Sequence, residues 1–152
     1  MFASNKINRL EEAAMKFEET HVLIVDDDPR LLRGLERHFD DAGFIVTTAV
    51  SAAEAQVILT EYLVDAIVCD NQMPGTSGKR FLATVSRDYP EVALFMLSGD
   101  VTKHDEWLIE QEIGVDGLFH KPCNPVEILA AIKEVVTAKE MEANGSTNAP
   151  SN

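Results

Sequence analysis

Acidic, hydroxyl and amine side chains stand directly after four short apolar runs of this 152-residue chain. Grouped carboxylates raise one another's pKa unless a cation neutralises them, and oxygen ligands of this kind suit Mg²⁺. With such an ion in place, a carboxylate can attack phosphorus while an amine and a hydroxyl hold the oxygens of the transferred group. The residues concerned are Asp26, Asp27 and Asp28 after the first run, Asp70 after the second, Ser98 after the third and Lys121 after the fourth.

These side chains can meet if the apolar runs are parallel strands of one sheet. The runs are short and continuously apolar, as strands covered on both faces are, and helical patterns alternate with them. Ligands of such a sheet bind beyond the carboxyl ends of its strands, which share one edge. The pattern predicts an α/β, doubly wound sheet with strands at 21–26, 44–49, 66–69, 92–97 and 116–120, and helices at 29–43, 51–62, 79–89, 102–113 and 125–139.

The two ends of the chain differ from this central part. Apolar residues recur at helical spacing near the start (Ile7, Leu10, Ala14 and Phe17), which predicts an amphipathic helix over residues 1–19. That helix can pack back on the domain or pair with a second copy of itself, which would give a homodimer. Residues 141–152 are mostly polar and are predicted to be a disordered tail. One folded domain is therefore expected over residues 20–140.

Composition excludes several classes of partner. The formal net charge of −13 opposes binding to nucleic acid and to anionic membranes. No stretch approaches the roughly 20 apolar residues of a membrane span, and the amino terminus lacks the apolar centre of a secretory signal. Cys69 and Cys123 form no metal-binding pair, so they are interpreted as reduced thiols of a cytoplasmic protein.

Four motifs together resemble those of bacterial response-regulator receiver domains, and the resemblance covers about residues 20 to 140. Each motif ends a predicted strand, and all four occur in the order typical of that family. The resemblance implies a flavodoxin-like (CheY-like) sheet of five strands in the order 2-1-3-4-5. The motifs are the run from Val22 to Pro29, the segment from Asp70 to Gly75 with Gly78, the segment from Leu97 to Gly99, and Lys121 with Pro122.

The resemblance also implies a role for each residue of the predicted site. Asp70 matches the phosphoryl acceptor, and Lys121 and Ser98 match the groups that contact the phosphoryl oxygens. Three residues match the family's Mg²⁺ ligands together with Asp70: Asp26, Asp27 and Gln72, the last through its backbone carbonyl. The peptide bond between Lys121 and Pro122 is expected to be cis, as is typical of the family. Asp28, which precedes Pro29, is interpreted as a helix cap.

These roles predict a single-domain response regulator that is not an enzyme beyond its own phosphorylation and dephosphorylation. A sensor histidine kinase or a histidine phosphotransfer protein would donate the phosphoryl group, and a downstream protein partner would read the change. Two alternatives remain. Leu118 stands where the family usually has an aromatic switch residue, which favours a phosphorylation-independent scaffold. The aspartates after the first strand also resemble haloacid-dehalogenase-type phosphatases, in which Asp26 would be the nucleophile.

Overall fold

Strands and helices alternate along the chain in the computed structural model, which describes residues 19–99 and 102–147. The strands coincide with the predicted apolar runs to within a residue or two at each end. The elements are β1 (His21–Val25), α2 (Pro29–Asp41), β2 (Ile45–Ala49), α3 (Ala52–Glu61), β3 (Ala66–Asp70), α4 (Gly78–Asp88), β4 (Ala93–Ser98), α5 (Lys103–Glu112), β5 (Gly117–His120) and α6 (Pro125–Thr147).

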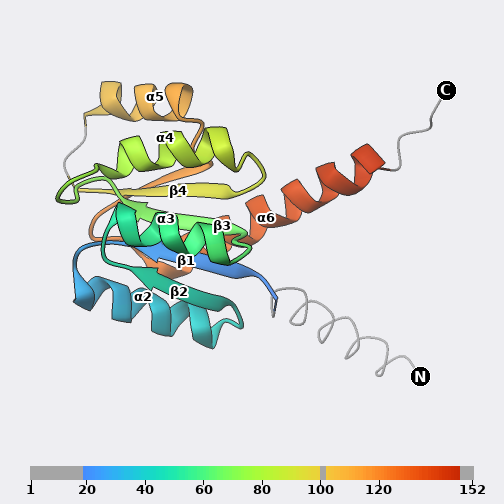
Figure 1. The fold of residues 1–152 in the computed structure, drawn as a ribbon, viewed down its shortest axis with the longest axis horizontal. Helices are drawn as coiled ribbons and strands as arrows, with labels where there is room; N and C mark the ends of the chain where they lie inside the picture. Colours follow the sequence, from blue (N-terminus) through green and yellow to red (C-terminus); the bar gives the residue numbers. More distant parts are fainter. Residues whose placement is uncertain (1–18, 100–101, 148–152) are drawn as a thin grey trace.

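The five strands form one parallel sheet in the order β2-β1-β3-β4-β5, which confirms the predicted fold (Figure 1). From β1 the chain moves outward to β2 and then crosses back to β3 on the other side of β1. The strand order therefore reverses between β1 and β3. In open parallel sheets, the crevice beyond the carboxyl ends of the strands at such a reversal is where ligands bind.

Apolar side chains fill both faces of the sheet, because its central strands are buried from end to end. Residues 22–25 of β1 have no exposed surface. Burying one large apolar side chain stabilises the folded state by roughly 1.5–3 kcal/mol. The packing on both faces therefore fixes the positions of the strand ends at the carboxyl edge of the sheet. One face packs against Leu35 and Phe39 of α2 and Ile128 and Ile132 of α6; the other packs against Leu59 of α3, Phe81 and Leu82 of α4 and Ile109 of α5.

Side-chain caps set where the helices begin beside the carboxyl edge. Asp28 Oδ1 accepts a hydrogen bond from the Arg30 amide at 2.9 Å, and Pro29 is the first residue of α2. This confirms that Asp28 is a cap. Ser51 Oγ accepts a hydrogen bond from the Glu54 amide at 3.2 Å and caps α3 in the same way.

The carboxyl-terminal helix is longer than predicted. Sequence patterns placed its end near Lys139 and a disordered tail over residues 141–152, but α6 continues to Thr147. Residues 139–143 are strong helix formers, and a single glycine at position 145 costs only about 1 kcal/mol, too little to end a helix. The predicted tail is therefore wrong as far as Thr147, and its remainder at 148–152 lies outside the described residues.

Helical spacing in the sequence places Tyr62 and Val126 on the inner faces of their predicted helices, but both side chains face solvent. Tyr62 has extended backbone dihedrals just after α3, which take its side chain off the helix face and leave it 56% exposed. Val126 is 66% exposed, because the buried stripe of α6 runs through Ile128, Ile132 and Val136.

The amino-terminal helix predicted over residues 1–19 falls almost wholly outside the described residues. Glu19 is a turn residue, and Thr20 is buried where it leads into β1. Within the described ranges, no helix has both the length and the apolar character needed to cross a membrane.

Candidate functional site

Asp26 lies at the centre of the carboxyl edge, immediately after β1. Its side chain is fully buried, and its amide donates a hydrogen bond to the Ala49 carbonyl at 3.1 Å. Oδ1 of Asp26 accepts a hydrogen bond from the Asp28 amide at 2.9 Å. The turn after β1 therefore holds this carboxylate in place, while the next residue, Asp27, is exposed at the rim.

Asp70 ends β3, the neighbour of β1, and lies beside those two aspartates. Its side chain is 5% exposed. Asp26, Asp27 and Asp70 each offer a carboxylate oxygen, and these oxygens lie within 4.8 Å of one another. The predicted meeting of the three carboxylates at one edge is thus what the structure shows.

Lys121 follows β5, the edge strand of the sheet, and its ammonium contacts two of these carboxylates. Its Nζ lies 3.0 Å from Asp26 Oδ2 and 3.2 Å from Asp70 Oδ1. Its backbone amide donates a hydrogen bond to the Ser98 carbonyl at 2.8 Å, which ties the residue to the end of β4. The bond between Lys121 and Pro122 is cis, as predicted. One ammonium therefore contacts two buried acids, of which Asp26 lies 95 residues away along the chain.

Burial and charge shift the pKa values of this pair. Burial raises the pKa of Asp26, and the charge of Asp70 adds to the rise, while the Asp28 amide and Lys121 oppose it. For Lys121, burial favours the neutral amine, but the hydrogen bonds and charges of Asp26 and Asp70 outweigh burial and raise its pKa. The ammonium is therefore firmly charged, and the cluster gains from any further cation beside Asp26.

Ser98 at the end of β4 has a buried hydroxyl with unused bonding capacity. The residue is 1% exposed, and within the described part of the chain its Oγ has no hydrogen-bond partner. Leaving such a group unsatisfied costs about 1–3 kcal/mol. A hydroxyl retained at this cost beside the acidic rim is suited to a ligand oxygen.

The residues present fit a magnesium ion. All the grouped ligands are carboxylate oxygens, which this hard cation prefers, and two of the three are buried at a fixed spacing. Gln72 lies two residues beyond Asp70 and its side chain is exposed. That its backbone carbonyl is a further ligand stays a prediction. Asp26, Asp27 and Asp70 are the side chains that would hold the ion.

Leu118, at the aromatic-switch position, and its neighbour Phe119 point to opposite faces of the sheet. Leu118 is half-buried and packs on the face covered by α3, α4 and α5, whereas Phe119 packs on the opposite face, where its ring lies 6.3 Å from that of Phe95. Cys69 is buried and points away from the rim into the first of these cores. The structure thus offers a leucine at the position that the family usually fills with an aromatic residue.

Sequence reasoning missed the part that Gly78 plays in placing the acceptor. A Cβ atom on Gly78 would collide with the carbonyl oxygen of Asp70 and would lie 2.8 Å from the Asp70 carbonyl carbon. The Gly78 amide donates a hydrogen bond to the Asn71 carbonyl at 3.1 Å. The first residue of α4 therefore presses directly on the backbone that carries Asp70. A glycine after a loop signals a turn, and only the folded path of the loop reveals this contact.

Replacing Gly78 with alanine is expected to lower the free energy of unfolding by about 1–3 kcal/mol, because the Asp70 backbone must move to admit the methyl group. Gly34→Ala is the matched control. A Cβ on Gly34 meets nothing within 4 Å, and the change lies within α2, so it should stabilise the fold by roughly 0.5–1 kcal/mol. Urea unfolding of both variants measures the two effects, and a Gly78→Ala protein as stable as the parent would contradict the contact.

Comparison with known proteins points to one family. The family model described as "Response regulator receiver domain" matches residues 22–133. The hydrogenase transcriptional regulatory protein HoxA of Cupriavidus necator is 32% identical over 130 residues, which are 86% of this chain and 27% of HoxA. The aerobic respiration control protein ArcA of Escherichia coli is 32% identical over 117 residues, which are 77% of this chain and 48% of ArcA. The chain thus spans less than half the length of these relatives.

Solved structures show the same architecture. A response regulator receiver domain protein (CheY-like) from Methanospirillum hungatei has a TM-score of 0.77 at 25% identity, with 82% of this chain and 98% of that chain covered. The chemotaxis protein CheY4 of Vibrio cholerae has a TM-score of 0.71 at 27% identity, with 77% of this chain and 98% of that chain covered. The sheet and its helices therefore match almost the whole length of each of these two solved chains.

Proposed function

Because this chain belongs to the response-regulator receiver-domain family, we propose that it accepts a phosphoryl group on Asp70 with Mg²⁺ bound and signals the change to a protein partner. The observation that carries the proposal is the grouping of three carboxylates within 4.8 Å, two of them paired with Lys121. A sensor histidine kinase or a histidine phosphotransfer protein is the proposed donor. We further propose that the chain turns over no other substrate.

In the proposed transfer, a carboxylate oxygen of Asp70 forms a bond to phosphorus while the bond from phosphorus to the donor's leaving atom breaks. The electron pair of that broken bond leaves with the donor. Bound Mg²⁺ would neutralise charge on the phosphoryl oxygens and on the acidic residues. Lys121 Nζ, 3.2 Å from Asp70 Oδ1, is close enough to pair with an oxygen of the transferred group.

The buried hydroxyl of Ser98 supplies the second contact in this proposal. Among the described residues it has no hydrogen-bond partner, so a phosphoryl oxygen on Asp70 would satisfy it without breaking a bond seen there. A new charge with several acceptor oxygens would thus draw Ser98 and Lys121 toward Asp70 from the ends of β4 and β5. These strands lead into α5 and α6, so the surface next to those helices would change with them.

The geometry gives less support to a phosphatase with Asp26 as its nucleophile. Oδ1 of Asp26 is bonded to the Asp28 amide and Oδ2 to Lys121, and the side chain has no exposed surface. An attacking oxygen must be free of such bonds and open to the substrate. Asp70 also contacts Lys121, but through Oδ1 alone, and its side chain keeps 5% exposure where that of Asp26 has none, so Asp70 is the better candidate.

Metal removal tests the proposal on the full chain. Incubation with a small phosphodonor such as acetyl phosphate and Mg²⁺ is expected to add the mass of one phosphoryl group, as measured by intact-mass spectrometry. Adding a chelator should reduce labelling to background, because the three carboxylates then repel the incoming phosphate. Absence of labelling with the metal present would favour the phosphorylation-independent scaffold. Labelling that ignores the chelator would contradict the metal site.

Ser98→Ala separates the role of this hydroxyl from a structural one. Removing an unsatisfied buried hydroxyl should leave the unfolding temperature unchanged or raise it. The rate of labelling should fall nonetheless, because one contact to the phosphoryl oxygens is lost. Ser98→Thr, which keeps a hydroxyl, is the matched control and should label near the parent rate. A Ser98→Ala protein that labels as fast as the parent would show that the Ser98 hydroxyl does not contribute to phosphoryl transfer.

A further inference from the structure

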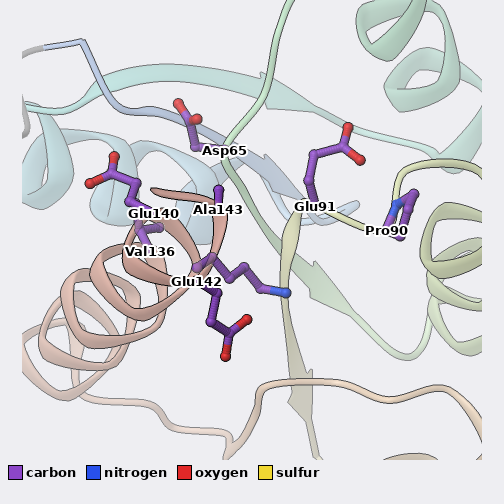
Figure 2. Close-up of a pocket in the computed structure, with 8 residues that line it drawn as sticks. Asp65, Pro90, Glu91, Val136, Glu140, Glu142 and Ala143 are labelled. Atoms are coloured by element: carbon purple, nitrogen blue, oxygen red, sulfur yellow. The ribbon is translucent and has the colours of Figure 1, made fainter. Parts of the chain in front are cut away.

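A cleft of about 470 Å³ lies at the amino edge of the sheet, away from the acidic rim. The loops that lead into β3 and β4 form one side of it, and the last turns of α6 form the other (Figure 2). This is where α6 runs past the sheet, beyond Val136, which is the last buried residue among the helix side chains that the structure describes. The side chains that characterise the cleft are Asp65, Glu91, Val136, Lys139, Glu140 and Glu142.

The cleft combines an apolar surface with an excess of negative charge. Pro90, Ala143 and the edge of Val136 supply apolar surface, and the residues that line the cleft carry four carboxylates and the ammonium of Lys139. Glu91, Glu140 and Glu142 are exposed, so their charges act on whatever lies in the cleft. Like charges that line one cleft repel one another, and an occupant with cationic side chains beside them would reduce that repulsion.

The chain itself enters the fold at the edge of this cleft. The His21 amide donates a hydrogen bond to Asp65 Oδ2 at 2.8 Å, and the Asp65 amide donates one to the His21 carbonyl at 2.9 Å. Thr20 is buried immediately before them. The segment that precedes Thr20 is therefore attached within a few residues of the cleft. A helix over residues 1–18 would extend about 27 Å, which is ample to run along the last turns of α6.

The sequence of residues 1–18 has the pattern that such a cleft would select. Ile7, Leu10, Ala14 and Phe17 form an apolar stripe at helical spacing. On a helix, Lys6, Arg9 and Lys16 would lie on one side of that stripe, and Glu11 and Glu18 would lie on its other side.

We propose that residues 1–18 dock as an amphipathic helix in the cleft of the same chain, with the apolar stripe on Val136 and Pro90 and the basic flank toward the carboxylates. The docked helix would tie the start of β1 to the end of α6. The acidic rim lies at the opposite edge of the sheet, so docking does not depend on phosphorylation of Asp70.

Charge reversal tests the docking in the full chain. The amides of residues 7–17 should exchange with deuterium at least about tenfold more slowly in the parent than in a variant with Lys6, Arg9 and Lys16 changed to glutamate. Glu91→Lys with Glu140→Lys should speed exchange in the same way. Combining both sets should restore slow exchange, because the charges are complementary again. Equal exchange rates in all four proteins, or no restoration in the combined variant, would overturn the proposal.

A matched control excludes a simple effect of net charge. Glu36→Lys with Glu110→Lys changes the net charge as much as the cleft variant, at exposed positions on α2 and α5, and should leave exchange of residues 7–17 at the parent rate. Labelling of Asp70 by acetyl phosphate should continue at the parent rate in the cleft variant, since no residue of the acidic rim is altered. This readout shows that the variant is folded and keeps a failure of docking distinct from a failure of the proposed function.

Cross-linking distinguishes docking in the same chain from docking in a second copy. A carbodiimide should join Lys6 or Lys16 to Glu91, Glu140 or Glu142. In an equal mixture of unlabelled and ¹⁵N-labelled protein, these linked peptides should each come from one isotopic population. Linked pairs of mixed isotope would show that the segment occupies another molecule's cleft and would overturn the proposal, as would the absence of these cross-links.

Discussion

Asp70→Asn is expected to abolish phosphoryl labelling by acetyl phosphate and Mg²⁺, because an amide at this position has no anionic oxygen to attack phosphorus. The substitution keeps the shape of the side chain, so the loss is one of chemistry. Asp70 ends β3 with its side chain 5% exposed and within 3.2 Å of Lys121. Intact-mass spectrometry at matched protein concentration measures the loss directly.

Asp28→Asn is the matched control for this result. Asp28 is exposed next to the site and caps α2, and asparagine is an equally good cap. This variant should therefore label at the parent rate. Labelling that persists in Asp70→Asn would show that the phosphoryl acceptor is a residue other than Asp70. If the same label were then lost in Asp26→Asn, the phosphatase-like alternative with Asp26 as nucleophile would become the better account.

The strands were within reach of the sequence, because each strand is a short apolar run that stops at a polar residue; their order came from the resemblance to receiver domains. The end of α6 was not, because residues 144–145 look like a helix stop although neighbouring residues favour continuation. Tyr62 was also misplaced. Its ring sits edge-on to the ring of His21 at 6.0 Å, a contact between distant parts of the chain that helical periodicity does not encode.

For the site, the sequence predicted which residues meet, but not how they contact one another. Carboxyl ends of parallel strands share an edge, so Asp26, Asp70 and Lys121 had to approach one another once the sheet was assigned. That one ammonium would contact both acids depends on side-chain rotamers and on the turn after β5. Two further features likewise depend on tertiary packing that the local sequence does not encode. They are the Ser98 hydroxyl without a partner among the described residues and the close contact of Gly78 with the Asp70 backbone.

Lys121→Met is expected to cost about 3 kcal/mol of unfolding free energy at neutral pH in metal-free buffer, because it leaves the buried carboxylate of Asp26 without its partner. Methionine keeps much of the length and apolar character of the lysine side chain, so the lost charge dominates. The exposed Lys103→Met is the matched control and should change stability by less than about 0.5 kcal/mol. Urea unfolding at several pH values measures both variants.

The pH dependence identifies the charge of Asp26 as the cause. Burial already raises the pKa of Asp26, and removing Lys121 removes an interaction that lowers it. A group whose pKa is raised by folding adds stability at low pH and loses it as pH rises through the folded pKa. The deficit of Lys121→Met should therefore shrink as the solution is acidified, and Mg²⁺ should reduce it at neutral pH.

A second substitution completes the cycle. Asp26→Asn in the Lys121→Met background removes the stranded charge, so most of the lost stability should return even without metal. Mg²⁺ should stabilise this double variant less than it stabilises Lys121→Met alone, because one of the three grouped carboxylates is gone. A deficit that is the same at every pH, and that Asp26→Asn does not repair, would mean that Lys121 stabilises the rim through packing and that its ion pair with Asp26 contributes little.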